Sequence, residues 1–179
     1  MNLYSYLENL LSQKTVLLYH GLGSNPASDK KNYLKKMNIE LTQDHHDYKK
    51  EFDFDGGKSF MIEQETKAKS YDIIMGISFG GYVAYMLACR LQKPVILINP
   101  AINRSVTKTN IKEYSYEYQN MKPKKIEYFC GENDKAVIFN DQKNIVDHSI
   151  TDFYKIKGME HRVPISFFKE ICEQSKLLK

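Results

Sequence analysis

The stretch from Tyr71 to Leu91 constrains the fold most, because an apolar run, a glycine-flanked serine and a helical pattern follow one another without a break. The apolar run leads into Gly76-Ile77-Ser78-Phe79-Gly80, and apolar residues then recur at helical spacing. Glycines two positions before and after a serine remove Cβ atoms that would collide in a sharp turn. The stretch therefore predicts a strand, a sharp turn with Ser78 at its apex, and a helix. The plainer alternative is a tight turn in which Ser78 only caps the helix.

Other apolar runs of strand length alternate with helical patterns along the chain. Strands are expected at 15–19, 38–42, before Ser78, 94–98, 125–129 and 151–156, and helices at 3–12, 27–37, 58–69, after Ser78, around 110–119, at 140–147 and from Pro164 onward. The polar segment 43–57 is expected to be a loop. Apolar strands separated by helices predict an α/β fold, with a mostly parallel sheet of about six strands and helices on both faces. The length favours one domain over residues 1–179.

Four conspicuous loops each follow a predicted strand. They are residues 20–26, 76–80, 131–137 and 157–163. Because open α/β sheets bind ligands at the carboxyl ends of their strands, we expect these loops to meet at one edge and to form the functional site.

Three side chains in those loops have the chemistry of a nucleophile, a base and a carboxylate. A serine hydroxyl needs a base to take its proton, and the base needs an orienting carboxylate. His161 follows the last strand and Asp134 the preceding one, so the order Ser78, Asp134, His161 is that of α/β-hydrolases. Glu132 is the alternative carboxylate, and a plain surface histidine is the alternative for His161.

The glycine-rich loop after the first strand is a candidate source of backbone donors. An oxyanion hole needs N–H groups directed at the developing negative charge. Phe79, directly after Ser78, is expected to supply one, and Leu22 or else Gly23 the other, with the His20 ring bracing the loop. A phosphate-binding turn is the alternative, but the loop has neither a P-loop lysine motif nor G-x-G-x-x-G.

The remaining histidines and the cysteines do not form a metal motif in the sequence. His45 and His46 are interpreted as solvent-exposed loop residues and His148 as a surface residue. Three widely spaced cysteines fit neither a disulfide framework nor a zinc site, and Cys130 is expected to be a buried thiol at a strand end. No metal or organic cofactor is expected.

Composition argues against several classes of partner. The net charge is +4, and the lysines occur as scattered pairs, so we do not expect nucleic-acid binding. No apolar run approaches 18 residues and the N-terminus lacks a basic, cleavable leader pattern, so we expect neither a membrane span nor a signal peptide. Together with the cysteine pattern, this predicts a cytoplasmic protein.

Four blocks in order resemble the small bacterial esterases of the YqiA type, which are α/β-hydrolases with a Ser-Asp-His triad. The blocks are residues 17–30, 76–82, 95–101 and 158–162, and the resemblance extends from about Leu17 to Phe168. It implies Ser78 as nucleophile, Asp134 as acid and His161 as base, with Leu22 and Phe79 at the oxyanion positions. Two departures concern the substrate pocket: residues 42–57 lack the family's proline-rich segment, and residues 101–123 are shorter than usual, which predicts a minimal cap or none.

The resulting hypothesis is a serine hydrolase of carboxylesterase or thioesterase type. It would cleave small or flexible acyl esters, its expected small-molecule partners, through an acyl-enzyme intermediate. A non-catalytic protein-binding module on the same fold and an acyltransferase are the alternatives. The sequence indicates neither the natural substrate nor the oligomeric state.

Overall fold

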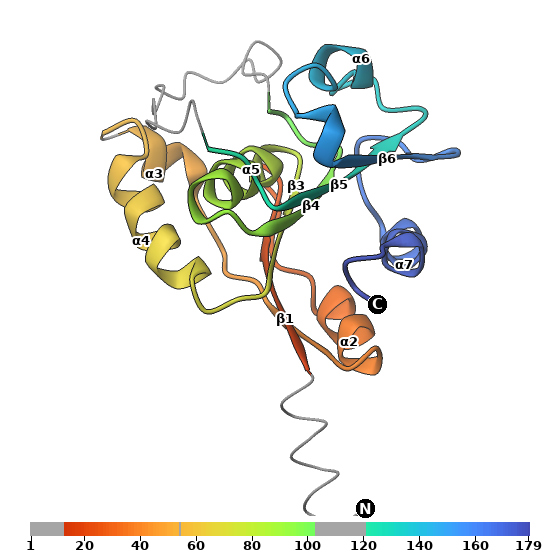
Figure 1. Cartoon of the computed structure of the whole chain (residues 1–179), viewed down its shortest axis with the longest axis horizontal. Helices are drawn as coiled ribbons and strands as arrows, with labels where there is room; N and C mark the ends of the chain where they lie inside the picture. The colour runs from red at the N-terminus through yellow and green to blue at the C-terminus, as the bar shows by residue number, and fades with distance from the viewer. Residues whose placement is uncertain (1–12, 54, 103–120) are drawn as a thin grey trace, which may run out of the picture.

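The computed structural model describes residues 13–53, 55–102 and 121–179 (Figure 1). Within them, six strands form one sheet in the order β2-β1-β3-β4-β5-β6, and every neighbouring pair is parallel. The strands are β1 (Lys14–Tyr19), β2 (Ile39–Thr42), β3 (Ile73–Ile77), β4 (Pro94–Ile98), β5 (Lys125–Gly131) and β6 (Thr151–Ile156). The predicted parallel α/β sheet is confirmed.

Helices cover both faces of this sheet, as predicted. One face carries α2 (Ser28–Lys36) and α7 (Ile165–Gln174), and the other carries α3 (Tyr48–Asp53), α4 (Lys58–Ala68) and α5 (Phe79–Leu91) (Figure 1). A short helix, α6 (Phe139–Gln142), lies between β5 and β6 in the chain. No helix in the described ranges is long and apolar enough to cross a bilayer.

The strands are apolar without alternation because each face is buried in its own core. Successive residues of β1 point to opposite faces, so Leu17 and Tyr19 join one core while Val16 and Leu18 join the other. All four are at most 1% exposed. A strand buried on both faces reads as a continuous apolar run, which explains why β1 could be identified from the sequence.

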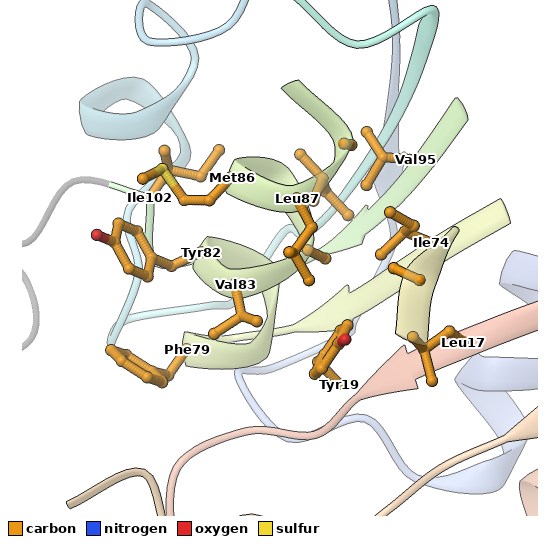
Figure 2. Close-up of a cluster of buried hydrophobic side chains, with 14 of the residues drawn as sticks. Leu17, Tyr19, Ile74, Phe79, Tyr82, Val83, Met86, Leu87, Val95 and Ile102 are labelled. Atoms are coloured by element: carbon orange, nitrogen blue, oxygen red, sulfur yellow. The ribbon is translucent and has the colours of Figure 1, made fainter. Parts of the chain in front are cut away.

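Helix α5 packs over the centre of the sheet and is buried almost all round. Figure 2 shows Val83 and Leu87 of this helix beside Leu17, Tyr19 and Ile74 of the strands. Close packing at its start depends on small residues. A Cβ added at Gly76 would lie 2.6 Å from the Cβ of Ala84, so this glycine lets the helix approach the sheet.

The prediction of a loop across residues 43–57 is wrong, because α3 lies within it. Tyr48 and Phe52, four residues apart, are each 1% exposed, and their rings lie 5.0 and 5.3 Å from the ring of Phe79. Only six residues long and rich in charge, α3 is too short to show helical periodicity, and it is held by this aromatic packing.

Three other expectations differ from the structure or lie outside it. The helix expected at 140–147 is only the four residues of α6. The helices expected at 3–12 and around 110–119 lie outside the described residues. Most of residues 101–123, the segment on which the expectation of a minimal cap depends, also lies outside the described residues.

Candidate active site

Ser78 lies at the apex of the turn between β3 and α5, in a backbone conformation that side chains rarely adopt. Its φ is 53° and its ψ is −120°. Such conformations cost about 1–3 kcal/mol and persist only where the surroundings enforce them. A Cβ at Gly80 would lie 2.2 Å from the carbonyl oxygen of Tyr19, and one at Gly76 would lie 2.2 Å from that of Gly80. The glycines that flank Ser78 are therefore required by sterics, as predicted.

Hydrogen bonds to the end of β4 hold this strained turn in place. The backbone N–H of Ser78 donates to the carbonyl of Ile98 at 3.0 Å, and the Ser78 carbonyl accepts from the N–H of Ala101 at 2.9 Å. The side chain of Ser78 makes no capping hydrogen bond to α5. The plainer interpretation of Ser78 as a helix cap therefore has no support in the geometry.

The structure brings Ser78, His161 and Asp134 together in one chain of hydrogen bonds. Nδ1–H of His161 donates to Oδ2 of Asp134 at 2.8 Å, which leaves Nε2 of His161 to accept from the Ser78 hydroxyl at 2.9 Å. The ring of His161 is oriented by a carboxylate on one side and contacts a hydroxyl on the other. This is the arrangement in which a histidine can take the proton of a serine.

Asp134 is fixed by the loop after β5. Its Oδ1 accepts backbone N–H groups from Ala136 at 2.8 Å and Val137 at 2.9 Å, while Oδ2 faces His161. Its side chain is only 2% exposed. Glu132, the alternative carboxylate, is exposed and forms no hydrogen bond or ion pair with His161. The geometry therefore favours Asp134, the carboxylate preferred from the sequence.

Asn99 joins the loops that carry the acid and the base, and reasoning from the sequence did not select it. It is 2% exposed, at the end of β4, with φ 44°. Its Nδ2 donates to the carbonyls of Glu160 at 2.9 Å and His161 at 3.2 Å, and its Oδ1 accepts from the N–H of Gly131 at 2.7 Å. The only signal was an asparagine between an apolar strand and a proline, a pattern that also occurs in ordinary turns.

His20 braces the loop after β1, as predicted. Its Nε2 accepts the backbone N–H of His46 at 2.8 Å, so Nδ1 carries the proton and donates to the carbonyl of Gly21, also at 2.8 Å. The bond accepted by Nε2 requires the neutral ring, and burial lowers the pKa of His20 below its usual value. The prediction that His46 is solvent-exposed is wrong, because the residue is only 9% exposed and its ring stacks on Tyr19. His148 is exposed, as predicted.

The backbone N–H groups predicted to stabilise an oxyanion are those of Phe79 and of Leu22 or Gly23. Phe79 is the first residue of α5, and Leu22 lies in the loop that His20 braces. Neither N–H donates to another group within the described part of the chain. Gly23 lines the same cavity as Leu22, so the second donor stays a prediction with these two alternatives.

The site opens into a cavity of about 730 Å³. Ser78 and His161 line it, together with residues 20–25 of the loop after β1 and residues 162–164 before α7. Cys130 does not line it and is 4% exposed at the end of β5, as predicted for a buried thiol. Burial raises the pKa of Cys130 to about 11, so this thiol is protonated near neutral pH.

A family model described as "Uncharacterised protein family (UPF0227)" matches residues 15–152. The chain belongs to this family. UPF0227 is the YqiA-type family, so the resemblance found in the four sequence blocks is confirmed. A comparison with curated proteins found no match.

Solved structures of α/β-hydrolases are similar to this UPF0227 protein over most of its length. XC6422 from Xanthomonas campestris, an α/β serine hydrolase without a lid, has a TM-score of 0.60 at 15% identity, over 90% of this chain and 80% of its own. The esterase domain of a Rhodothermus marinus protein scores 0.64 at 12% identity, over 90% and 84%. The Paleococcus ferrophilus monoacylglycerol lipase scores 0.60 at 12% identity, over 92% and 93%.

These likenesses show the fold. At such identities a shared architecture does not establish a shared reaction, because one fold supports many functions. The UPF0227 chain therefore has the α/β-hydrolase fold, and its chemistry has to be argued from its own site.

Proposed function

We propose that this UPF0227 protein is a serine hydrolase that cleaves carboxylic esters or thioesters. The observation that carries the proposal is the unbroken chain of hydrogen bonds from Ser78 through His161 to Asp134, open to a cavity at the Ser78 end. A serine, a base and a buried carboxylate in this order are the parts of an activated nucleophile. The esterase and lipase structures with the same fold are consistent with it.

The first half of the reaction forms an acyl-enzyme. Ser78 Oγ attacks the substrate carbonyl carbon while its proton passes to Nε2 of His161, and the carbonyl oxygen becomes an oxyanion. The N–H groups of Phe79 and of Leu22 or Gly23 stabilise this charge. His161 then gives the proton to the leaving oxygen or sulfur as its bond to the carbonyl carbon breaks, and an alcohol or thiol departs.

The second half restores the enzyme. Water attacks the acyl carbon and gives a proton to Nε2 of His161, the bond between Ser78 Oγ and the acyl group breaks, and Oγ regains the proton. A carboxylic acid is released. Throughout, Asp134 accepts Nδ1–H, which fixes the tautomer of His161 and stabilises its cation. These steps use only side chains and backbone groups of this chain and water.

Fluorophosphonate labelling tests the proposal without a guess about the substrate. The intact mass and a peptide map are expected to show one adduct, on Ser78. Ser78→Ala should abolish it, and His161→Ala should slow it by at least about a hundredfold, because general base catalysis contributes about 10²–10⁴. Ser166→Ala, which removes an exposed serine of α7, is the matched control and should label normally. Folding of each variant is checked by circular dichroism.

Each alternative predicts a different result. A folded protein that forms no adduct, or forms one elsewhere, would refute the proposal and favour a non-catalytic binding module. Labelling at Ser78 with an ester product that appears only when an alcohol is added would indicate acyl transfer in place of hydrolysis.

A further inference from the structure

The charged side chains around the cavity are all of one sign. Lys30 and Arg162 line it together with Ser78 and His161, and no aspartate or glutamate lines it within the described residues. Asp134 lies behind His161 and is engaged by two backbone N–H groups and the imidazole. Within the described residues, the space that a substrate would occupy is therefore lined by two positively charged side chains and by no negatively charged one.

Lys30 is held at the edge of this cavity by an aromatic ring and not by a carboxylate. It lies in the first turn of α2 and is half-buried, and its Nζ lies 5.6 Å from the ring centroid of Phe168 on α7. The neighbouring Asp29 accepts the backbone N–H of Lys30 at 2.8 Å, and among the described residues the Lys30 side chain forms no ion pair.

Arg162 also lines this cavity, although it lies far from Lys30 in the sequence. It follows His161 directly, and its side chain has no carboxylate partner among the described residues. Two cations elsewhere in the described residues show what a paired side chain looks like: Lys122 contacts Asp147 at 2.6 Å and Lys125 contacts Asp152 at 3.0 Å. The two cations at the cavity are left available for a ligand.

From these charges we infer that the ester or thioester cleaved at Ser78 carries a negatively charged group, such as a carboxylate or a phosphate, on its acyl chain or its leaving group. The inference rests on the proposed function and names its substrate class. Opposite charges within a few ångströms attract far more strongly in a partly enclosed site than in water. A guanidinium also matches the paired oxygens of a carboxylate or phosphate.

The experiment compares esters that differ in charge and little else. On the acyl side, the mono-p-nitrophenyl ester of adipic acid is compared with that of adipamic acid, its neutral amide, and with p-nitrophenyl 6-aminohexanoate, which is cationic. On the leaving-group side, 4-acetoxybenzoate is compared with 4-acetoxybenzamide. We expect kcat/KM to be at least about tenfold higher for the anion in one of the two series, and lowest for the cation.

Three variants connect this preference to the two side chains. Lys30→Met and Arg162→Met should each lower kcat/KM for the anionic ester about five- to tenfold through KM, and leave the neutral ester within about twofold. Lys31→Met, an exposed neighbour on the same helix, is the matched control and should change neither. The rate of fluorophosphonate labelling at Ser78 shows whether each variant keeps its reactive serine.

The outcomes separate this inference from the function on which it rests. Equal rates for charged and neutral esters in both series, or an anion preference that survives both substitutions, would overturn the inference and leave the hydrolase intact. Failure to hydrolyse any of the five esters, with no labelling of Ser78, would refute the proposed function and the inference with it.

Discussion

Replacing Asn99 by glycine tests whether the loops of the acid and the base depend on one side chain. The substitution removes both amide donors to the carbonyls of Glu160 and His161 and the acceptor for the N–H of Gly131. Glycine adopts the positive φ of this position without strain, and it introduces no charge. The backbone conformation is therefore permitted, and only the three hydrogen bonds are lost.

The expected cost follows from the groups left without a partner. A buried donor with no acceptor costs about 1–3 kcal/mol, and each lost bond to a carbonyl costs about 0.5–1.5 kcal/mol. The free energy of unfolding should therefore fall by about 2–6 kcal/mol. Because a displacement of about 1 Å at a catalytic group can cost about 10²-fold in rate, kcat should fall about 10- to 100-fold. KM should stay within about threefold, since Asn99 does not line the cavity.

Asn38→Gly is the matched control for this experiment. Asn38 also has a positive φ, of 59°, but it is exposed, and its side chain makes no hydrogen bond among the described residues. The chemical change and the backbone conformation are the same in both variants, so any difference between them belongs to the hydrogen bonds of Asn99. The control should alter the free energy of unfolding by less than about 1 kcal/mol and leave kcat unchanged.

Urea unfolding gives the stability of each variant, and steady-state hydrolysis of the preferred ester gives kcat and KM at a temperature where both are folded. The rate of fluorophosphonate labelling at Ser78 gives an independent measure of the base. If Asn99→Gly loses stability but keeps kcat and the labelling rate within twofold of the parent protein, Asn99 supports the fold and does not position the base. If it behaves like Asn38→Gly in every assay, the reasoning from buried partners is wrong.

Three further predictions follow from the same geometry. Gly80→Ala should destabilise the protein by about 3 kcal/mol or prevent folding, as measured by urea unfolding, because its Cβ would lie 2.2 Å from the carbonyl oxygen of Tyr19. Iodoacetamide at pH 7.5 should leave activity intact, because burial raises the pKa of the Cys130 thiol to about 11. Cys130→Ala should keep activity within about twofold, because Cys130 does not line the cavity. The melting temperature should fall as the pH drops below about 6.5, the ordinary pKa of histidine. In the unfolded chain His20 takes up a proton in this range, whereas in the folded chain burial lowers its pKa and keeps it neutral, so acid favours unfolding. His20→Gln should flatten this dependence and the exposed His148→Gln should not, and an unchanged slope in His20→Gln would contradict the assignment.

The parts of the fold that could be predicted are those whose signal lies within a short stretch of sequence. A strand buried on both faces is a continuous apolar run, so β1 and β4 were found from their own residues. The turn at Ser78 was found because sterics demand glycines at fixed offsets. Chain order and the strand ends then placed Asp134 and His161 at the same edge, where the structure brings them together.

The parts that were missed depend on partners distant in sequence. Helix α3 is held by the packing of Tyr48 and Phe52 on Phe79, which lies well beyond the helix itself. The local sequence predicts a solvent-exposed His46, because nothing near it in the chain shows that its ring stacks on Tyr19 and that its backbone N–H bonds to His20. In both cases tertiary contacts outweigh a polar local sequence.

Asn99 shows why the support of this site could not be read from the chain. The end of β4 supports two parts of the site at once. Ile98 and Ala101 bond to the backbone of Ser78, while Asn99 bonds to the loops of the acid and the base. A nucleophile held at positive φ needs surroundings that enforce it, and a base is useful only at a fixed distance from that nucleophile. Because one turn meets both demands, a change there should affect the nucleophile and the base together, whereas a change at Lys30 or Arg162 should affect substrate choice alone.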